Sequence, residues 1–113
     1  MSISSTKTAP HYVWGDRCDG WRLLDGADLS VIEERMPPGT AELRHVHDRA
    51  NQLFYVLEGR LSLSLADGPL ELGPGDALNI RPGTEHQARN DGDDPVRFLV
   101  ISAPTTAGDR QTV

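Results

Sequence analysis

The sequence predicts an all-β fold whose strands close into a small barrel or sandwich. The stretch "LSLSL" at 61–65 alternates strictly, so Leu61, Leu63 and Leu65 share one face of an extended strand. The stretches "NQLFYVLEG" and "VRFLVIS" are rich in β-branched and aromatic residues and end at turn formers. No long stretch has helical periodicity. Short strands at even spacing are typical of β-sandwiches and barrels.

The expected strands follow one another along the chain, separated by clusters that continue neither a strand nor a helix. These clusters are "MPPGT", "ADGP", "LGPGD", "RPGT" and "NDGDDP". A chain of 113 residues predicts a single domain, 1–113, with its core at about 20–103. We expect 1–10 and 104–113 to be tails, disordered or docked on a partner. The expected strands are 20–24, 29–36, 41–46, 52–57, 61–66, 70–72, 77–80, 86–89 and 96–102.

Composition and charge exclude several classes of function. The net charge is −6, and the arginines are scattered among acids rather than gathered into a basic stripe, so we expect no nucleic-acid partner. No apolar run approaches the roughly 18 residues of a membrane span, and no secretory signal precedes the strands. Cys18 is the only cysteine, which excludes an internal disulfide and predicts a reducing, cytoplasmic location.

The stretch "RHVHDRANQ" holds two of the four histidines. Residues two apart on a strand point the same way, so His45 and His47 project side by side. His86 opens a later expected strand directly after "RPGT". These imidazoles converge only if the sheet closes on itself, as in a small barrel. Taken alone, "HVH" is as compatible with a non-ligand role as with a metal site.

Other side chains are expected near these histidines by alternation. Gln52 begins the next apolar run, and Phe54 and Val56 share its face, while Ala88 lies on the side of His86. We expect these three apolar residues to form the wall of a pocket. Glu42 and its neighbour Arg44 alternate away from the two histidines, which predicts surface or interface ion pairs. No inward carboxylate is therefore expected near the cluster.

The spacing of the glycine, proline and histidine residues in these stretches resembles that of the cupin superfamily, whose two motifs are G-x5-H-x-H-x3-4-E-x6-G and G-x5-P-x-G-x2-H-x3-N. In the first, Gln52 stands in the glutamate position. In the second, Arg81 stands where the first proline would be, and Pro82 follows it. Fifteen residues separate the motifs, and the matched stretch covers about half the chain. The residues that match the motifs are Gly39, His45, His47, Gly59, Gly75, Gly83, His86 and Asn90.

The resemblance implies a double-stranded β-helix, or jelly-roll barrel, with a metal in its mouth, and commonly a homodimer. His45, His47 and His86 would hold one divalent ion, with Gln52 as a fourth ligand or hydrogen-bonded to a metal-bound water. Replacing the carboxylate by an amide makes the donor set neutral and disfavours hard ions. Imidazole suits Fe2+ and Zn2+ first, with Ni2+, Cu2+ or Mn2+ as further candidates.

Three functions are compatible with these residues. The first is a metal-dependent enzyme acting on a small polar, anionic metabolite, either a dioxygenase or an isomerase, cyclase or lyase. Because no inward acid or base is expected, chemistry that the metal conducts by itself is favoured, with oxygenase slightly ahead. The second is a non-catalytic barrel that binds or senses a metal or metabolite. The third is a zinc cupin that joins two nitrogen atoms together with a tRNA-synthetase-like partner.

Overall fold

The computed structural model describes residues 1–113, which form eleven β-strands and no helix. The strands are β1 (His11–Trp14), β2 (Cys18–Asp25), β3 (Ser30–Met36), β4 (His45–His47), β5 (Asn51–Glu58), β6 (Leu61–Leu65), β7 (Gly68–Leu72), β8 (Ala77–Ile80), β9 (Gln87–Arg89), β10 (Val96–Ala103) and β11 (Arg110–Thr112).

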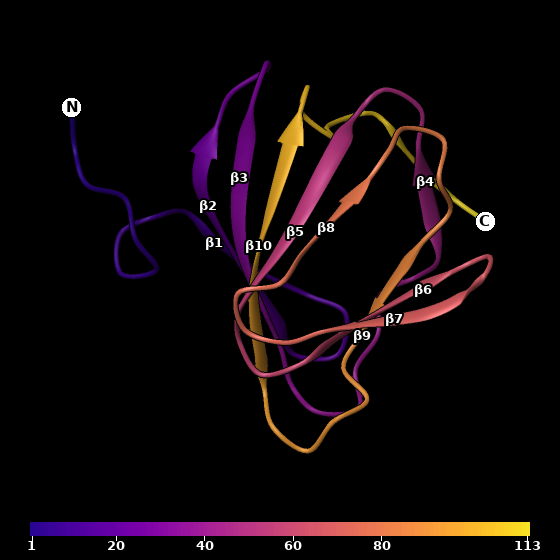
Figure 1. Ribbon diagram of the computed structural model, residues 1–113. Helices are drawn as coiled ribbons and strands as arrows, with labels where there is room; N and C mark the ends of the chain where they lie inside the picture. Colours follow the sequence, from indigo (N-terminus) through magenta and orange to yellow (C-terminus); the bar gives the residue numbers. More distant parts are fainter.

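Six strands form one antiparallel sheet in the order β1-β2-β3-β10-β5-β8 (Figure 1). The long strand β10 lies at its centre and pairs with β3 on one side and β5 on the other. Its register places Ser102 opposite Gln52 and Val100 opposite Phe54. Because directly opposed residues point to the same face, these side chains all enter the barrel.

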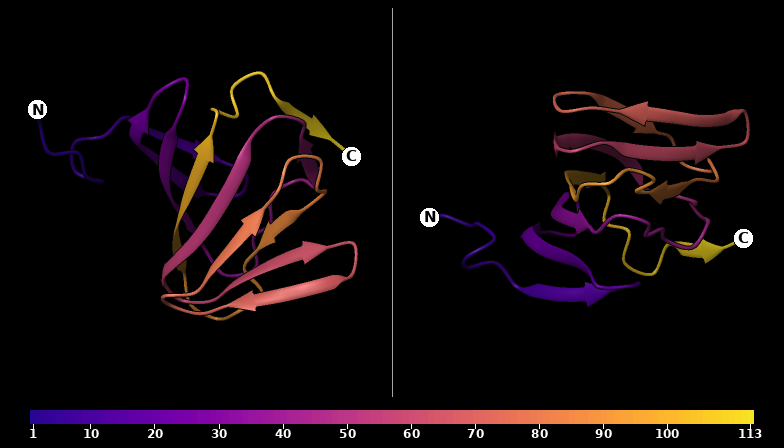
Figure 2. Two further views of the ribbon diagram at one scale, coloured as in Figure 1. Left: turned by 45° about the horizontal axis from the view of Figure 1, so that its top comes forward. Right: turned by 90° about the horizontal axis from the view of Figure 1, so that it is seen from below.

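Two smaller sheets face the six-stranded one and close the barrel, as the views in Figures 1 and 2 agree. One has the order β7-β6-β9, and the other pairs β11 with β4. Twelve buried apolar residues fill the space between the layers, and Phe98, Met36, Leu61 and Leu63 are among the largest that are fully buried.

The motif glycines lie at chain reversals, as expected. Gly59 has φ of 82°, and a Cβ added there would lie 2.5 Å from the carbonyl oxygen of Pro95. Only glycine fits this turn between β5 and β6 without displacing backbone. Asn90 holds the turn after β9 through its side-chain amide. The amide donates to the carbonyl oxygens of Met36 and Asp94, at 2.9 Å each.

The expected strands are found with small changes at their ends, and the all-β prediction is confirmed. The third is shorter than expected, because 41–44 joins the structure only through a bridge from Ala41 to Arg89. The tail prediction for 104–113 is wrong, because 110–112 forms β11 and pairs with β4. The core boundary at 20 is also too late, since β1 adds a strand at 11–14.

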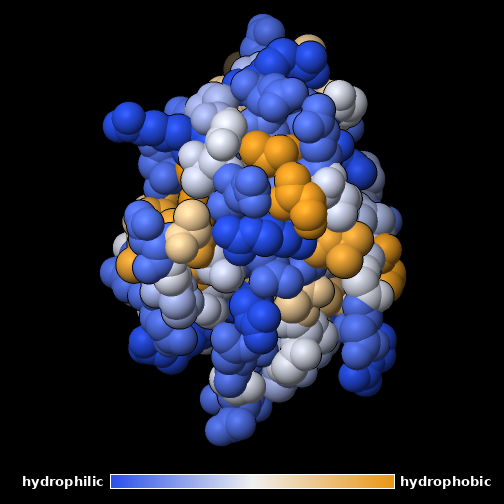
Figure 3. Space-filling model, turned by 90° about the vertical axis from the view of Figure 1, so that its right-hand side faces the viewer, coloured by the Kyte–Doolittle hydropathy of each residue, from blue (hydrophilic) through white to orange (hydrophobic).

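The surface is largely hydrophilic, with a group of hydrophobic residues near the centre of the face shown in Figure 3. Exposed apolar side chains include Leu43, Leu70 and Val113. None of the secondary structure is a helix of the length and hydropathy that crossing a bilayer would need. The expected homodimer stays a prediction.

Candidate metal centre

His45, His47 and His86 meet at one end of the barrel. One nitrogen from each ring lies within 4.8 Å of the others, and all three residues are buried. His45 and His47 come from the same face of β4, as alternation predicts. His86 lies just before β9, beside His45. Their backbones exchange two hydrogen bonds, each with a nitrogen–oxygen distance of 3.0 Å. The sequence prediction that these rings converge is therefore confirmed in geometry.

Backbone carbonyls fix the orientation of all three rings. The Nδ1 atoms of His45, His47 and His86 lie 2.8, 3.1 and 2.9 Å from the carbonyl oxygens of Leu43, Asp109 and Thr84. A carbonyl can only accept, so each Nδ1 carries the proton and each Nε2 keeps its lone pair. The buried Nε2 of His86 has no hydrogen-bond partner. This is the arrangement of metal-ligating histidines, whose other ring nitrogen donates to a fixed acceptor.

Burial keeps these rings neutral. It lowers the pKa of His45 to about 3, against the opposing effect of its bond to Leu43. Burial likewise lowers the pKa of His47 and of His86 below the ordinary histidine value. At neutral pH all three imidazoles are therefore uncharged. That is the protonation state a metal ion needs in a ligand.

Gln52 stands next to the histidines with an unsatisfied oxygen. Its Nε2 donates to the hydroxyl of Ser102 at 3.2 Å, which orients the amide. Its Oε1 is buried and has no hydrogen-bond partner. A buried polar atom without a partner costs stability, so an oxygen held in this way fits a ligand that is not a protein atom. Whether that ligand is a metal or a metal-bound water stays a prediction.

A cavity of about 140 Å³ opens beside these groups. Phe54 forms part of its wall, as expected. Val56 and Ala88 do not line it, because both are packed in the apolar core below. The twelve lining residues are Tyr12, Ile32, Glu34, Glu42, His45, His47, Gln52, Phe54, Val100, Ser102, Thr106 and Arg110.

Two carboxyl groups line this cavity, which corrects the expectation that no acid faces the site. Glu34 lies on the inward face of β3 between Ile32 and Met36, so alternation around these apolar neighbours was the signal that could have found it. Glu42 was expected on the surface, but its side chain is only 11% exposed. Residues 41–44 are not a regular strand, so alternation does not apply to them.

The two acids differ in how firmly they are held. One oxygen of Glu42 accepts the backbone N–H of Ala88 at 2.9 Å and lies 3.8 Å from Nδ1 of His45. Its other oxygen lies 4.0 Å from the guanidinium of Arg110. Glu34 has a single side-chain contact, with the hydroxyl of Tyr12 at 3.5 Å. Both oxygens of Glu42 are thus engaged by protein groups, whereas the carboxyl of Glu34 is available to a molecule in the cavity.

The Tyr12 side chain lies over Gly20 and thereby reaches Glu34. The register aligns Tyr12, Gly20 and Glu34 on neighbouring strands β1, β2 and β3. A Cβ on Gly20 would lie 2.2 Å from the Tyr12 ring, so only glycine lets the ring lie across the sheet. The Arg22 guanidinium lies over the Tyr12 ring, 4.6 Å from its centroid. The sequence reasoning missed this wall of the cavity because it began the barrel after β1.

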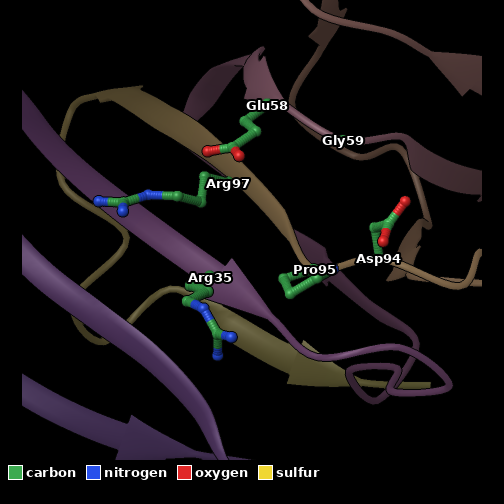
Figure 4. A pocket seen from close by; sticks show the side chains of 6 residues that line it. All are labelled: Arg35, Glu58, Gly59, Asp94, Pro95 and Arg97. Atoms are coloured by element: carbon green, nitrogen blue, oxygen red, sulfur yellow. The ribbon is translucent and has the colours of Figure 1, made fainter.

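A larger cavity, of about 400 Å³, lies at the other end of β5 (Figure 4). It contains no histidine, and its two arginines are engaged by carboxylates. Arg35 lies 3.8 Å from Asp19, and Arg97 donates to Glu33. This cavity therefore lacks the unpartnered polar atoms that distinguish the histidine site. Its lining residues are Arg35, Glu58, Gly59, Asp94, Pro95 and Arg97.

Comparison with known sequences identifies a matching family model and related proteins. Residues 32–102 match the family model described as the cupin domain. An uncharacterized protein of Methanocaldococcus jannaschii is 34% identical over 82 residues, which cover 73% of this chain and 66% of that protein. Quercetin 2,3-dioxygenase of Bacillus subtilis is 31% identical over 87 residues, covering 65% of this chain. The match covers only 26% of the dioxygenase.

Solved structures agree with this assignment. A protein of Silicibacter pomeroyi, described as a sugar phosphate isomerase of the cupin superfamily, superimposes with a TM-score of 0.81 at 26% identity. The similarity covers 92% of this chain and 76% of that one. The family model also spans both groups of histidines that form the centre described above. By sequence and by structure, the chain belongs to the cupin family.

Proposed function

We propose that this protein binds one divalent metal ion and catalyses proton transfer, as an isomerase or lyase, on a small polar metabolite with an anionic group. The observation that supports this proposal is a single cavity with two kinds of group. His45, His47, the Gln52 amide with its unpartnered Oε1 and the carboxyl of Glu34 line this cavity, and a ring nitrogen of His86 lies within 4.8 Å of those of His45 and His47. The ligand set would be His45, His47 and His86, with Gln52 beside them.

The donor atoms fit a borderline metal ion. Three neutral imidazoles and an amide oxygen carry no negative charge, which favours Zn2+ or Fe2+ over harder ions that prefer carboxylates. When bound, such an ion would supply Lewis-acid polarisation of a substrate oxygen. Ser102 keeps the Gln52 amide oriented, and the three backbone carbonyls keep the rings oriented. The protein thus contributes a rigid, preformed site.

Glu34 provides the proton-transfer group. Burial, together with the nearby carboxyl of Glu42, raises the pKa of Glu34 to about 8. A carboxyl with such a pKa carries a proton at neutral pH, and it can donate that proton and take one back within one reaction cycle. Its position in the cavity wall places it within reach of a small molecule held at the histidines. This acid removes the reason for favouring oxygenase chemistry.

The cavity sets the size and charge of the substrate. About 140 Å³ is less than half of the roughly 300 Å³ at which pockets for drug-sized ligands begin. Arg110 contributes a guanidinium whose contacts are long, 3.5 Å to the carbonyl of Leu43 and 4.0 Å to Glu42. A loosely held guanidinium is suited to a carboxylate or phosphate of the substrate. The structural neighbour described as a sugar phosphate isomerase supports the same substrate class.

A dioxygenase is the second candidate, because one relative has that activity in its name. The cavity argues against a substrate of that size, since quercetin is a three-ring flavonol. An oxygenase acting on a smaller molecule would still use the same histidines. In that case Glu34 would have no part in the chemistry, which separates the two candidates by experiment.

The test is solvent-proton exchange. The protein is loaded with Zn2+ or Fe2+ and incubated in D2O with sugar phosphates and small hydroxy- and oxo-acids, and substrate C–H signals are followed by NMR. We expect deuterium to enter next to a carbonyl, and we expect Glu34→Gln to abolish this exchange while leaving metal content unchanged. The matched control is Glu58→Gln, at an exposed position at the other end of β5. Oxygen uptake without exchange, equal in wild type and Glu34→Gln, would establish the oxygenase instead.

A further inference from the structure

The C-terminal segment lies directly against the strand that carries two of the histidines. Arg110, Gln111 and Thr112 of β11 stand opposite His47, Val46 and His45 of β4, respectively. The backbone N–H of Val113 continues the ladder by donating to the carbonyl of Arg44 at 3.1 Å. Figures 1 and 2 show this yellow end of the chain beside β4. We call residues 105–113 the strap.

The strap supplies the acceptor that orients His47. His45 and His86 each donate to a carbonyl two residues earlier in their own segment, from Leu43 and Thr84. His47 instead donates to the carbonyl of Asp109, 62 residues further along the chain. Two of the three rings are thus oriented by local turns. The third depends on a contact that exists only when the strap is docked.

The side chain of Asp109 holds that carbonyl in place. Its two oxygens accept the backbone N–H groups of Asp48, Arg49 and Ala50, at distances from 2.9 to 3.3 Å. This turn directly follows His47 and leads into β5, where Gln52 lies. Burial opposes ionisation of Asp109, but these hydrogen bonds outweigh it and hold the pKa of the carboxyl below its ordinary value. Asp109 therefore orients the ring of His47 and holds the turn between β4 and β5.

The strap also completes the cavity. Thr106 and Arg110 are two of its lining residues, and they flank Asp109 on either side. Loss of the docked strap would therefore remove one wall of the cavity as well as the acceptor for His47. The segment has no apolar alternation of its own. Its attachment rests on main-chain hydrogen bonds and on the buried carboxylate of Asp109, with longer contacts from the side chains of Arg110 and Gln111.

We infer that Asp109 is a positioning residue for the metal centre, acting through His47, and that the strap is a structural part of the site. This inference rests on the proposed metal site, since its consequence is metal affinity. The outer hydrogen-bond partners of ligating histidines contribute about 10–100-fold to metal affinity. Removing the Asp109 side chain frees both the turn and the carbonyl, so we expect Asp109→Ala to weaken binding within that range.

The experiment measures Co2+ binding by its visible absorption and the protonation of each histidine ring by 15N NMR of the metal-free protein. In wild type, His47 should be protonated on Nδ1. In Asp109→Ala, Co2+ affinity should fall about 10–100-fold, and His47 should populate both tautomers while His45 and His86 stay unchanged. Asp109→Asn retains one acceptor oxygen and should restore affinity in part. Asp93→Ala, which removes an exposed carboxylate after β9, is the matched control.

The outcomes separate this inference from the proposed function. If wild type binds no Co2+, the metal site is refuted, while the tautomer of His47 still tests the strap. If wild type binds Co2+ and Asp109→Ala binds it equally with an unchanged His47 tautomer, the positioning role is refuted alone. Should Asp109→Ala fail to fold, Asp109→Asn and the hydrogen-bond coupling between His47 Nδ1 and the Asp109 carbonyl in wild type give the answer. Absence of that coupling would contradict the inference.

Discussion

Replacing Glu34 by glutamine should make the stability of the metal-free protein less sensitive to alkaline pH. The pKa of Glu34 rises from 4.5 to about 8 on folding, chiefly because burial disfavours the carboxylate. A carboxyl with a raised folded pKa contributes most to stability below pH 4.5, and that contribution is lost as the pH rises toward 8. Glutamine has a similar shape and no such titration. The free energy of unfolding of the variant should therefore rise relative to that of wild type as the solution becomes more alkaline.

The size of the effect follows from the two pKa values. Between them, one proton contributes a slope of about 1.4 kcal/mol per pH unit to the free energy of unfolding. From pH 6 to pH 8 the full shift would give about 2 kcal/mol. Because the Glu34 side chain borders a solvent-accessible cavity, water reduces the penalty. We therefore expect wild type to lose about 1–2 kcal/mol relative to Glu34→Gln over this range.

Urea denaturation of the metal-free proteins at pH 6, 7 and 8, with a chelator present, measures this difference. Glu58→Gln, an exposed substitution, should follow the wild-type pH dependence. Parallel stability curves for wild type and Glu34→Gln would show that Glu34 is ionised in the folded protein at neutral pH. That result would refute its assignment as a proton donor.

Gln52→Glu should keep the metal and raise Mn2+ affinity about tenfold or more relative to Zn2+, because Mn2+ prefers a carboxylate. Competition titration of the two ions measures this, and an unchanged preference would mean that residue 52 does not contact the ion. Gly20→Ala should lower stability by about 1–3 kcal/mol through its clash with the Tyr12 ring. Adding Tyr12→Ala to this variant should recover most of the lost stability, and equal thermal midpoints for wild type and Gly20→Ala would contradict the close packing of Tyr12 on Gly20. Phe98→Ala should cost about 3–5 kcal/mol, since this side chain is fully buried in the core, and a loss below about 1 kcal/mol in urea denaturation would contradict its place there. Zn2+ at a hundredfold excess over its Kd should stabilise the protein by about 2.7 kcal/mol, and a thermal midpoint unaffected by Zn2+ would contradict binding to the folded state.

The sequence predicts the barrel well because its strands carry a period of two. Leu61 and Leu63 are fully buried, and Gln52 and Phe54 share an inward face, as alternation requires. The same alternation places Glu34 on the inward face of its strand, between Ile32 and Met36, but it does not indicate that this face borders a cavity. Glu34 was missed because alternation shows which face of the strand a residue occupies and not what space lies in front of that face.

Other parts of the site have no periodic signature. Glu42 lies in a segment that is not a regular strand, so its burial follows from a hydrogen bond to Ala88, 46 residues away along the chain. The C-terminal strap is polar, and Asp109 is buried because it caps three backbone N–H groups of a distant turn. Contacts of this kind depend on tertiary structure, and local patterns cannot report them.

X-ray absorption spectroscopy of the Zn2+-loaded protein measures the proposed ligand set itself. We expect one ion per chain, bound by three imidazole nitrogens at about 2.0–2.1 Å together with oxygen donors. His86→Ala should lose the ion or show one imidazole fewer. A wild-type spectrum with fewer than three imidazoles, or an identical spectrum and metal content in His86→Ala, would contradict the metal centre.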